Sequence, residues 1–185
     1  ECENICFSVR IYPKDADKDQ VLQLMKQQID DLLLESGIDK NRLLGVGIGV
    51  PGVIDYKNNY SVFFERINGW ENVLIGDIIQ EYIGKPVYIC NDVNLISWAE
   101  RKVAHLEDIK NMLYIIIRSG IGMAIWNDGS LMQGEMGNSG RIGHMTVDKN
   151  GLQCKCGNRG CLGLYTSEKS MIRMYGELTG KELKW

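Results

Sequence analysis

Three cysteines and one histidine lie close together late in the sequence. Cys154, Cys156 and Cys161 fall within one short loop, and His144 precedes the first of them by ten residues. Thiolate sulfur and imidazole nitrogen are the donors that zinc prefers, whereas a redox pair is more often Cys-x-x-Cys beside a βαβ unit. Four protein ligands leave no open coordination position. The spacing therefore predicts a structural zinc site, with His144 as a ligand instead of an ordinary core histidine.

A second polar cluster follows a short apolar segment in the middle of the chain. Asn91-Asp92-Val93-Asn94 comes directly after residues 86–90, a predicted buried strand, and begins a predicted helix. Ligands of open α/β sheets gather at the carboxyl ends of strands, where the carboxylate of Asp92 can take a proton from a substrate hydroxyl. The same residues suit a helix start, where Asn91 or Asp92 would only bond free backbone amides. The spacing alone leaves both interpretations open.

Two glycine-containing turns are further candidate binding elements. Residues 47–52 and the segment Ser119-Gly120-Ile121-Gly122 each continue an apolar strand, and backbone amides in such turns can approach phosphates or sugar hydroxyls. Neither fits the Walker A or Rossmann pattern, so tight turns without a ligand are the competing interpretation. Asn68-Gly69-Trp70 offers an aromatic ring that can stack on a sugar, although a single tryptophan is more often part of a core.

Alternating strands and helices must position these residues. The patterns predict strands at residues 6–12, 43–50, 86–90 and 112–117, helices at about 18–36, 74–82, 93–104 and 165–177, and a hairpin over 123–132. Gly37 and Gly84 are predicted helix stops. This order of elements predicts an α/β fold with a mainly parallel sheet. We expect two lobes, residues 1–100 and 101–185.

The composition is that of a globular protein. The chain has 185 residues, 44% of them hydrophobic, and its net charge of -3, without a block of one sign, gives no footprint for nucleic acid. It has no apolar run long enough to span a membrane and no signal-peptide pattern, so we expect a cytoplasmic protein without a membrane partner. Because the chain begins without Met and inside a predicted strand, we expect it to be truncated at both ends. Cys2, Cys6 and Cys90 are predicted to be buried hydrophobic residues.

In their order along the chain, these motifs resemble the ROK family, whose name joins repressors, open reading frames and sugar kinases. The matching segments are residues 47–52, 68–70, 91–94 and 119–122, Gly143-His144, and the Cys-x-Cys-Gly-x-x-Gly-Cys loop at 154–161. The resemblance covers approximately residues 43–166. It implies an actin-like ATPase fold, which is ribonuclease-H-like, with two α/β lobes and a sugar cleft between them.

The resemblance also implies roles for individual residues. In the family's kinases, the aspartate at the position of Asp92 is the base toward a sugar hydroxyl, and the asparagines at the positions of Asn68 and Asn91 hold the sugar. The histidine at the position of His144 both binds zinc and lies against the sugar. Ser119, Gly120 and Gly122 match a phosphate-binding turn, although a threonine is common at the first of these positions.

Two departures from the family pattern concern the sugar site. Kinases and many sugar-sensing members have a glutamate three residues before the ligand histidine, where this chain has Arg141. A second glutamate is expected two residues after the last cysteine, where this chain has Gly163. Two hydrogen-bond acceptors are thus absent, and Arg141 would instead donate to an anionic or acceptor-rich ligand. The departures argue against an ordinary hexose.

The favoured hypothesis is therefore the effector-binding domain of a ROK-type transcriptional regulator, acting as a homodimer and touching DNA only through a domain outside this chain. The loss of two carboxylates is easier to tolerate where a sugar or sugar derivative only shifts a conformational equilibrium than it is in catalysis.

The alternative is an ATP-dependent sugar kinase, with Asp92 as base and Mg-ATP at the glycine turns. A third hypothesis keeps the fold and zinc without small-molecule activity, with Arg141 paired to a nearby acid. The family's first phosphate motif and its winged helix-turn-helix would both lie upstream of Glu1.

Overall fold

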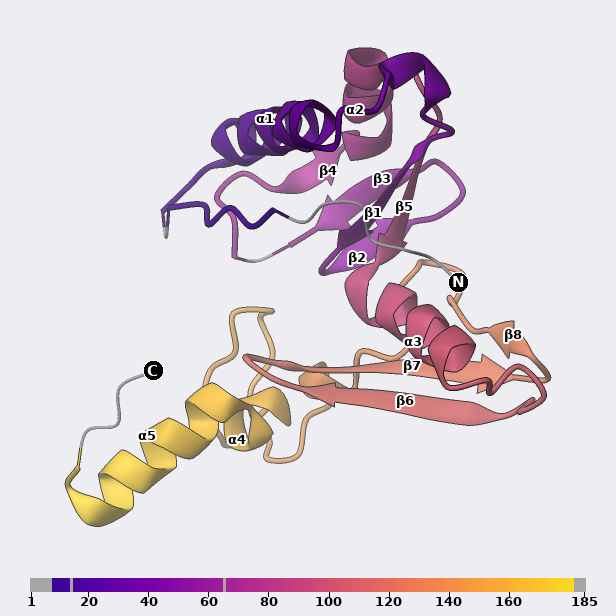
Figure 1. Ribbon diagram of the computed structural model, residues 1–185. Helices are drawn as coiled ribbons and strands as arrows, with labels where there is room; N and C mark the ends of the chain where they lie inside the picture. The colour runs from indigo at the N-terminus through magenta and orange to yellow at the C-terminus, as the bar shows by residue number, and fades with distance from the viewer. Residues whose placement is uncertain (1–7, 14, 65, 182–185) are drawn as a thin grey trace. The chain divides into compact units, whose positions relative to one another are not determined.

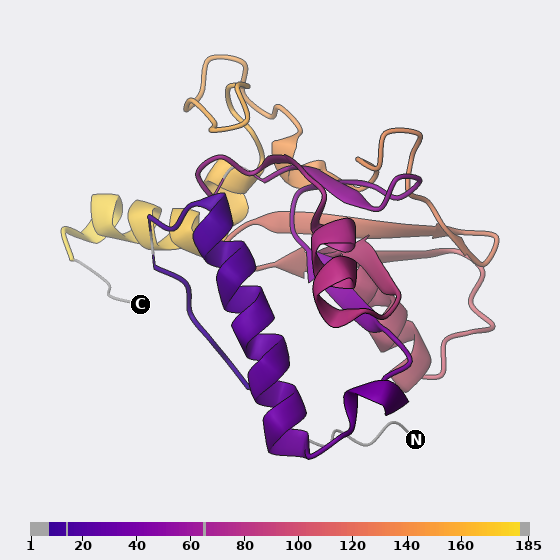
Figure 2. The same ribbon diagram turned by 90° about the horizontal axis from the view of Figure 1, so that it is seen from above.

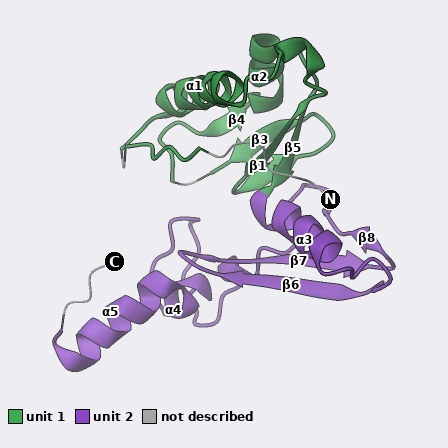
Figure 3. Ribbon diagram, in the orientation of Figure 1, with its two compact units in different colours: residues 1–91 green, residues 92–185 purple. Residues whose placement is uncertain are grey.

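The computed structural model describes residues 8–13, 15–64 and 66–181, and it divides into two units, Glu1–Asn91 and Asp92–Trp185 (Figure 3). The sequence predicts that the first lobe ends at residue 100. The second unit begins earlier because helix α3 (Asp92–Val103) packs on strand β7 (Ile121–Asn127).

Two helices of the first unit begin and end where their sequences predict. Helix α1 (Lys18–Ser36) starts with a capping box, in which Gln20 N–H donates to the Asp17 carboxylate and Asp17 N–H donates to the Gln20 side chain. It ends at Gly37, and α2 (Ile75–Ile83) ends at Gly84. Both glycines have φ angles in the left-handed region, 64° and 67°. The two predicted glycine stops are therefore confirmed.

The strands of the first unit form two small sheets, beside the short turn η1 (Lys40–Arg42). Strands β1 (Val46–Val50) and β5 (Val87–Asn91) pair in parallel, and β2 (Val53–Asp55), β3 (Tyr60–Phe63) and β4 (Glu71–Val73) form an antiparallel meander. Helices α1 and α2 lie together over the strands (Figures 1 and 2). The apolar sides of these elements enclose one core, centred on Ile54, Ile75 and Ile79.

The second unit joins an antiparallel sheet to a loop-rich segment. Strand β6 (Met112–Ile117) pairs with β7, and β7 pairs with β8 (Ser130–Leu131) through a turn in which Asp128 and Gly129 have φ angles of 47° and 76°. This is the predicted Asp-Gly hairpin. After the short turn η2 (Ile142–His144) and the cysteine loop come α4 (Gly163–Thr166) and α5 (Glu168–Thr179).

Several expectations from the sequence are wrong. Residues 8–12 form no strand, because apolar alternation needs a neighbouring strand to pair with; the rest of that predicted strand lies outside the described residues, as do Cys2 and Cys6. In the described part of the chain only β1 and β5 pair in parallel, so the sheet is not mainly parallel. The helix predicted at 165–177 is two helices that meet at Ser167.

None of the described helices is long and apolar enough to cross a bilayer.

Candidate metal centre and ligand-binding residues

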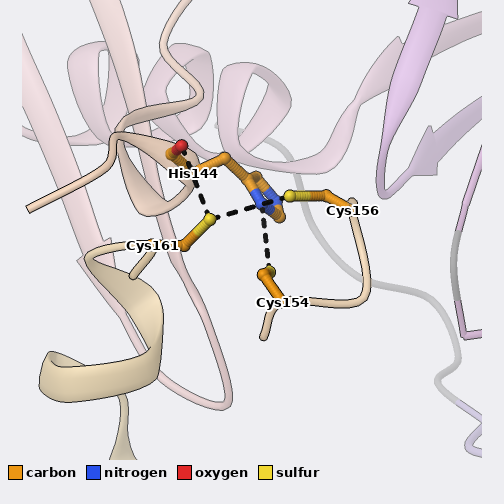
Figure 4. Close-up of side chains that lie close together, drawn as sticks. All are labelled: His144, Cys154, Cys156 and Cys161. Carbon is orange, nitrogen blue, oxygen red and sulfur yellow. Dashed lines mark hydrogen bonds between the residues drawn. The ribbon is translucent and has the colours of Figure 1, made fainter. Parts of the chain in front are cut away.

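His144, Cys154, Cys156 and Cys161 form a cluster in the second unit (Figure 4). Their ligand atoms all lie within 4.8 Å of one another. The Cys154 Sγ is 3.8 Å from His144 Nδ1, and the Cys156 Sγ is 3.7 Å from the Cys161 Sγ. A sulfur pair at that distance is not a disulfide, which requires about 2.05 Å. The structure thus brings together the four residues that the spacing selected.

The loop that carries the cysteines is fixed by close backbone packing. Gly160 has a φ angle of 61°, and a Cβ atom there would lie 1.7 Å from the carbonyl oxygen of Asp148. Only glycine fits this approach. The hydroxyl of Tyr165, on α4, accepts a backbone N–H of the loop at 3.3 Å. Cys161 itself is 1% exposed and forms an isolated bridge with Thr146. The loop therefore presents its thiols at fixed positions.

The thiols differ in acidity because their surroundings differ. Burial, and then the neighbouring thiols of Cys154 and Cys156, raise the pKa of Cys161 to about 12. Burial also raises the pKa of Cys156, but a hydrogen bond from the Asn158 backbone, the two other thiols and the positive charge of Arg141 outweigh it, so this pKa lies below 9.0. A metal ion would displace the protons, since thiolates are the binding form.

The donor set and spacing fit a tetrahedral ion. With Zn–S bonds of about 2.3 Å, the sulfur atoms of a tetrahedral site lie about 3.8 Å apart. The Cys156–Cys161 sulfur separation of 3.7 Å agrees with this value. One imidazole and three thiols fill four positions and leave none for water or substrate. The cluster is thus suited to hold a metal that orders the loop.

The two candidate sugar-binding asparagines lie in the first unit. The Asn68 side chain is exposed, while its backbone carbonyl accepts the N–H of Lys18 at 3.0 Å. Trp70 is 2% exposed and its Nε1 donates to Ser61 Oγ at 2.8 Å, so this ring belongs to the core and does not offer a stacking face. Asn91 is the last residue of β5 and is half-buried.

Asp92 begins α3, as both interpretations of its sequence position require. Its Oδ1 accepts the N–H of the next residue, Val93, at 2.9 Å, whereas a capping side chain accepts an N–H two or three residues farther along, so this contact is not the cap that the helix-start interpretation predicts. The carboxylate is half-buried. A role as a base toward a ligand hydroxyl stays a prediction, since a carboxylate can accept more than one hydrogen bond.

The start of β7 collects other candidates of the second unit. A Cβ atom at Gly122 would lie 2.6 Å from Cγ2 of Val93, and one at Gly143 would lie 2.4 Å from the carbonyl oxygen of Ile121. The first turn of α3, which carries Asp92, and the turn η2 therefore both touch the start of β7. Gly122 acts as a packing residue here, which the sequence did not indicate.

The turn between β6 and β7 contains the predicted phosphate-binding residues. Ser119 is exposed, and the carbonyl oxygen of Gly120 accepts the N–H of Arg118 at 2.9 Å. The carbonyl oxygen of Arg118 accepts the N–H of Glu168 at 3.0 Å, so the first residue of α5 lies against this turn. Phosphate binding by Ser119, Gly120 and Gly122 stays a prediction.

Sequence reasoning missed the residues that support Asn91. The Asn91 N–H donates to the Tyr56 hydroxyl at 3.3 Å, and Asn91 Nδ2 donates to the carbonyl oxygen of Gly52 at 3.2 Å. Gly52 has a φ angle of 93°, and a Cβ atom there would lie 2.1 Å from the carbonyl oxygen of Phe63. The Pro51-Gly52 pair was a signal for a turn, but nothing in the sequence linked that turn to Asn91.

Comparison with known proteins identifies the family to which the cluster of His144 and the cysteines and its surrounding elements belong. The sequence pattern of the ROK family matches residues 8–185. The chain belongs to the ROK family. The xylose repressor of Bacillus spizizenii is 39% identical over 131 residues, which are 71% of this chain and 34% of the repressor. The glucokinase of Halalkalibacterium halodurans is 33% identical over 140 residues, which are 75% of this chain and 42% of that enzyme.

Solved structures of ROK proteins have the same fold. A ROK family transcriptional regulator described as a homologue of the E. coli MLC protein has a TM-score of 0.75 and 28% identity, with 91% of this chain and 43% of that one covered. A ROK family glucokinase from Streptomyces griseus, in complex with glucose and AMPPNP, has a TM-score of 0.78 and 25% identity, with 90% and 53% covered. The actin-like ATPase fold class is confirmed. This chain spans about a third to a half of the length of these ROK proteins.

Proposed function

We propose that this chain is the effector-binding part of a ROK-family transcriptional regulator and that its effector is a sugar or sugar derivative. Xylose repressors from two Bacillus species, 38% and 39% identical to this chain, support the proposal, as does the likeness to a solved ROK regulator. Effector binding would shift an equilibrium between conformations, and a DNA-binding domain outside this chain and a second protomer would respond to the shift.

The observation that carries the proposal is Arg141. It precedes η2 directly and is half-buried, and its guanidinium makes no hydrogen bond or ion pair with any residue the structure describes. The acid partner that the third hypothesis requires is therefore absent from the described residues. A cation beside His144, at a position where family kinases carry glutamate, suits a ligand with an anionic or acceptor-rich group. The same cation suits phosphoryl transfer to the hydroxyl of a neutral hexose less well.

The cluster of His144 and the three cysteines is proposed to hold a structural Zn²⁺. The metal would tie the loop to η2 and so fix His144 and its neighbour Arg141. Metal analysis of the purified chain should give one zinc per protein, reduced in Cys156→Ser and unchanged in Cys90→Ser, because Cys90 lies in β5 outside the cluster. Equal zinc content in wild type and Cys156→Ser would contradict the site.

Calorimetry with xylose, glucose, glucuronate and glucose 6-phosphate tests the effector proposal. We expect binding of at least one probe, and a preference for the anionic probes that Arg141→Glu reverses by charge repulsion. Lys110→Ala is the control, since this exposed cation pairs with Asp128 in the turn between β7 and β8. If the wild-type chain binds none of the four probes, the effector proposal is wrong.

The second candidate function is an ATP-dependent sugar kinase, favoured by the position of Asp92 in the first turn of α3, against the start of β7. In that function Asp92 would accept a proton from a sugar hydroxyl while the hydroxyl oxygen attacks the γ-phosphorus, and Mg-ATP would supply the phosphoryl group. A coupled ADP-release assay with each sugar distinguishes the functions. ADP release that depends on sugar and is abolished in Asp92→Asn would favour the kinase.

A further inference from the structure

Strand β5 has one edge that pairs with no other strand in the described part of the chain. Its partner β1 takes the opposite edge, where Val46 N–H donates to the carbonyl oxygen of Pro86. Alternate residues of a strand direct their backbone groups to opposite edges, so Val87, Ile89 and Asn91 direct theirs away from β1. An edge of this kind leaves donors and acceptors that need partners.

Side chains supply these partners in place of a strand. The side-chain amide of Asn59 donates to the Val87 carbonyl oxygen at 2.8 Å and accepts the Ile89 N–H at 3.0 Å. Its two ends thus reproduce the pair of hydrogen bonds that one residue of a neighbouring strand would make. Farther along, the Tyr56 hydroxyl accepts the Asn91 N–H, and the Gly52 carbonyl oxygen accepts from the Asn91 side chain. These groups come from one continuous segment, and the remaining donor of this edge, the Val87 N–H, donates to Gln80 Oε1 of α2 at 3.3 Å.

The surrounding backbone is shaped to admit these groups. Asn59 has a φ angle of 55°, in the left-handed region that asparagine tolerates better than most residues. A Cβ atom at Gly76 of α2 would lie 2.2 Å from Asn59 Nδ2, so glycine at that helical position leaves the amide its space. Gly52 is restricted in the same way by Phe63. The two close approaches are restrictions that a simple surface hairpin would not need.

We propose that Gly52, Tyr56 and Asn59 form a clamp that holds β5 along its open edge and orients Asn91 for its ligand, with Tyr56 and Asn59 as positioning residues. The clamp fixes both the backbone and the side chain of Asn91, so the amide reaches a ligand without losing further conformational freedom. The role toward a ligand rests on the proposed function.

The test uses the whole chain with substitutions that remove single contacts. Tyr56→Phe removes only the hydroxyl that meets Asn91 N–H, and Asn59→Ala removes both bonds to β5. The matched control is Asn58→Ala in the same hairpin, whose side chain bonds to Asp55 and not to β5. NMR of the Asn91 side-chain amide, amide hydrogen exchange of Ile89 and Asn91, and the affinity for whichever of xylose, glucose, glucuronate and glucose 6-phosphate binds best are measured for each variant.

We expect Tyr56→Phe to shift the Asn91 side-chain amide resonances, to accelerate exchange at the Asn91 amide and to weaken probe affinity about tenfold, as the loss of one buried hydrogen bond does. Asn59→Ala should accelerate exchange at Ile89 most. Asn58→Ala should change none of these. A purely structural role would lower the urea midpoint while leaving the affinity of the folded protein unchanged.

The outcomes separate the clamp from the proposed function. If Asn91→Ala abolishes probe binding but Tyr56→Phe binds like wild type, the positioning role is wrong and the proposed function stands. If the wild-type chain binds no probe, the proposed function fails, and the Asn91 resonances decide the clamp by themselves. Unchanged resonances and exchange rates in Tyr56→Phe would overturn it.

Discussion

The first unit buries fourteen of the apolar side chains that the structure describes in a single cluster, whereas the second unit buries only Ala124, Trp126 and Cys161. The buried polar residues are distributed the other way: Ser61 lies in the first unit, and Asn94, Ser97, Arg101, Ser167 and Ser170 lie in the second. Burial of apolar area, at about 25 cal/mol per Å², therefore stabilises the first unit far more than the second. The second unit depends on directional contacts.

The contacts between α3 and Trp126 lie on one face of the sheet in the second unit. Arg101 of α3 is 6% exposed, stacks 4.4 Å above the Trp126 ring, and donates to the Glu107 carbonyl oxygen at 2.5 Å. The opposite face of the sheet carries exposed apolar side chains on β6, namely Leu113, Ile115 and Ile117, which are 51% to 62% exposed. With so little apolar burial, a metal in the cysteine loop would have a large share in ordering this unit.

The largest expected effect is the loss of a metal ligand. In Cys161→Ser the second unit should lose much of its order, because metal binding contributes on the order of 10 kcal/mol to folding in small zinc domains. Hydrogen exchange followed by mass spectrometry should show faster exchange throughout residues 142–166 and unchanged protection in α1 and α2. Cys90→Ser is the control. Equal protection of the cysteine loop in both variants would show that the second unit does not need the metal.

The second-largest expected effect is a loss of metal affinity in the second unit as the pH falls. The three thiols must be deprotonated to bind metal, and the pKa of Cys161 is raised to about 12 in the metal-free protein. Protons therefore compete with the metal more strongly as the pH falls, and affinity should drop by up to about a thousandfold per pH unit. Competition with a chromophoric chelator between pH 6 and 8 measures this dependence. A pH-independent affinity would mean that the thiols are not the ligands.

The same substitution should change the stability of the two units by very different amounts. Ile79 of α2 is 0% exposed, and Ile79→Ala should lower the free energy of unfolding of the first unit by about 2–5 kcal/mol. Ile115 of β6 is 51% exposed, and Ile115→Ala should change the stability of the second unit by less than about 1 kcal/mol. Urea unfolding followed by exchange in each unit measures both. A large loss in Ile115→Ala would mean that this face is covered in solution.

The smallest of these effects concerns the polar interior of the second unit. Arg101→Ala removes the contact with the Trp126 ring and should cost about 1–3 kcal/mol. Lys102→Ala, whose side chain is 80% exposed and pairs with Glu107, should cost less than about 1 kcal/mol. The tryptophan fluorescence transition in urea reports on both. Equal effects of the two substitutions would mean that the stacked guanidinium contributes no more than a surface charge.

The features that could be predicted from the sequence depend on residues that lie near one another along the chain. The glycine stops and the Asp-Gly hairpin act through bonds between near neighbours, so the helix ends and the hairpin could be located. The cluster of His144 and the three cysteines could be predicted because the cysteines are confined to one loop. Strands β2, β3 and β4 were missed, since segments of three or four residues are too short to show alternation.

Contacts between distant segments could not be predicted from the sequence. In the sequence, Arg101 looks like any exposed helical arginine, because its contact with the Trp126 ring depends on the fold. The pairing of Asn59 with β5 joins residues 28 and 30 positions apart, and no periodicity encodes it. The candidate sugar-binding residues came from the family resemblance, because the spacing around Asp92 fits a simple helix start equally well.

The close approach of Gly76 to Asn59 has a consequence for sequence variation. Alanine favours a helix more than glycine does, although Gly76 lies in the first turn of α2, so a scheme that scores α2 by itself would choose Gly76→Ala. Here the added methyl group would displace the amide that substitutes for a neighbouring strand. A Cβ atom at position 76 would also lie 2.5 Å from the backbone carbonyl oxygen of Asn59, so replacing the asparagine alone would not make room for a larger residue, and stabilising designs must treat the two positions together.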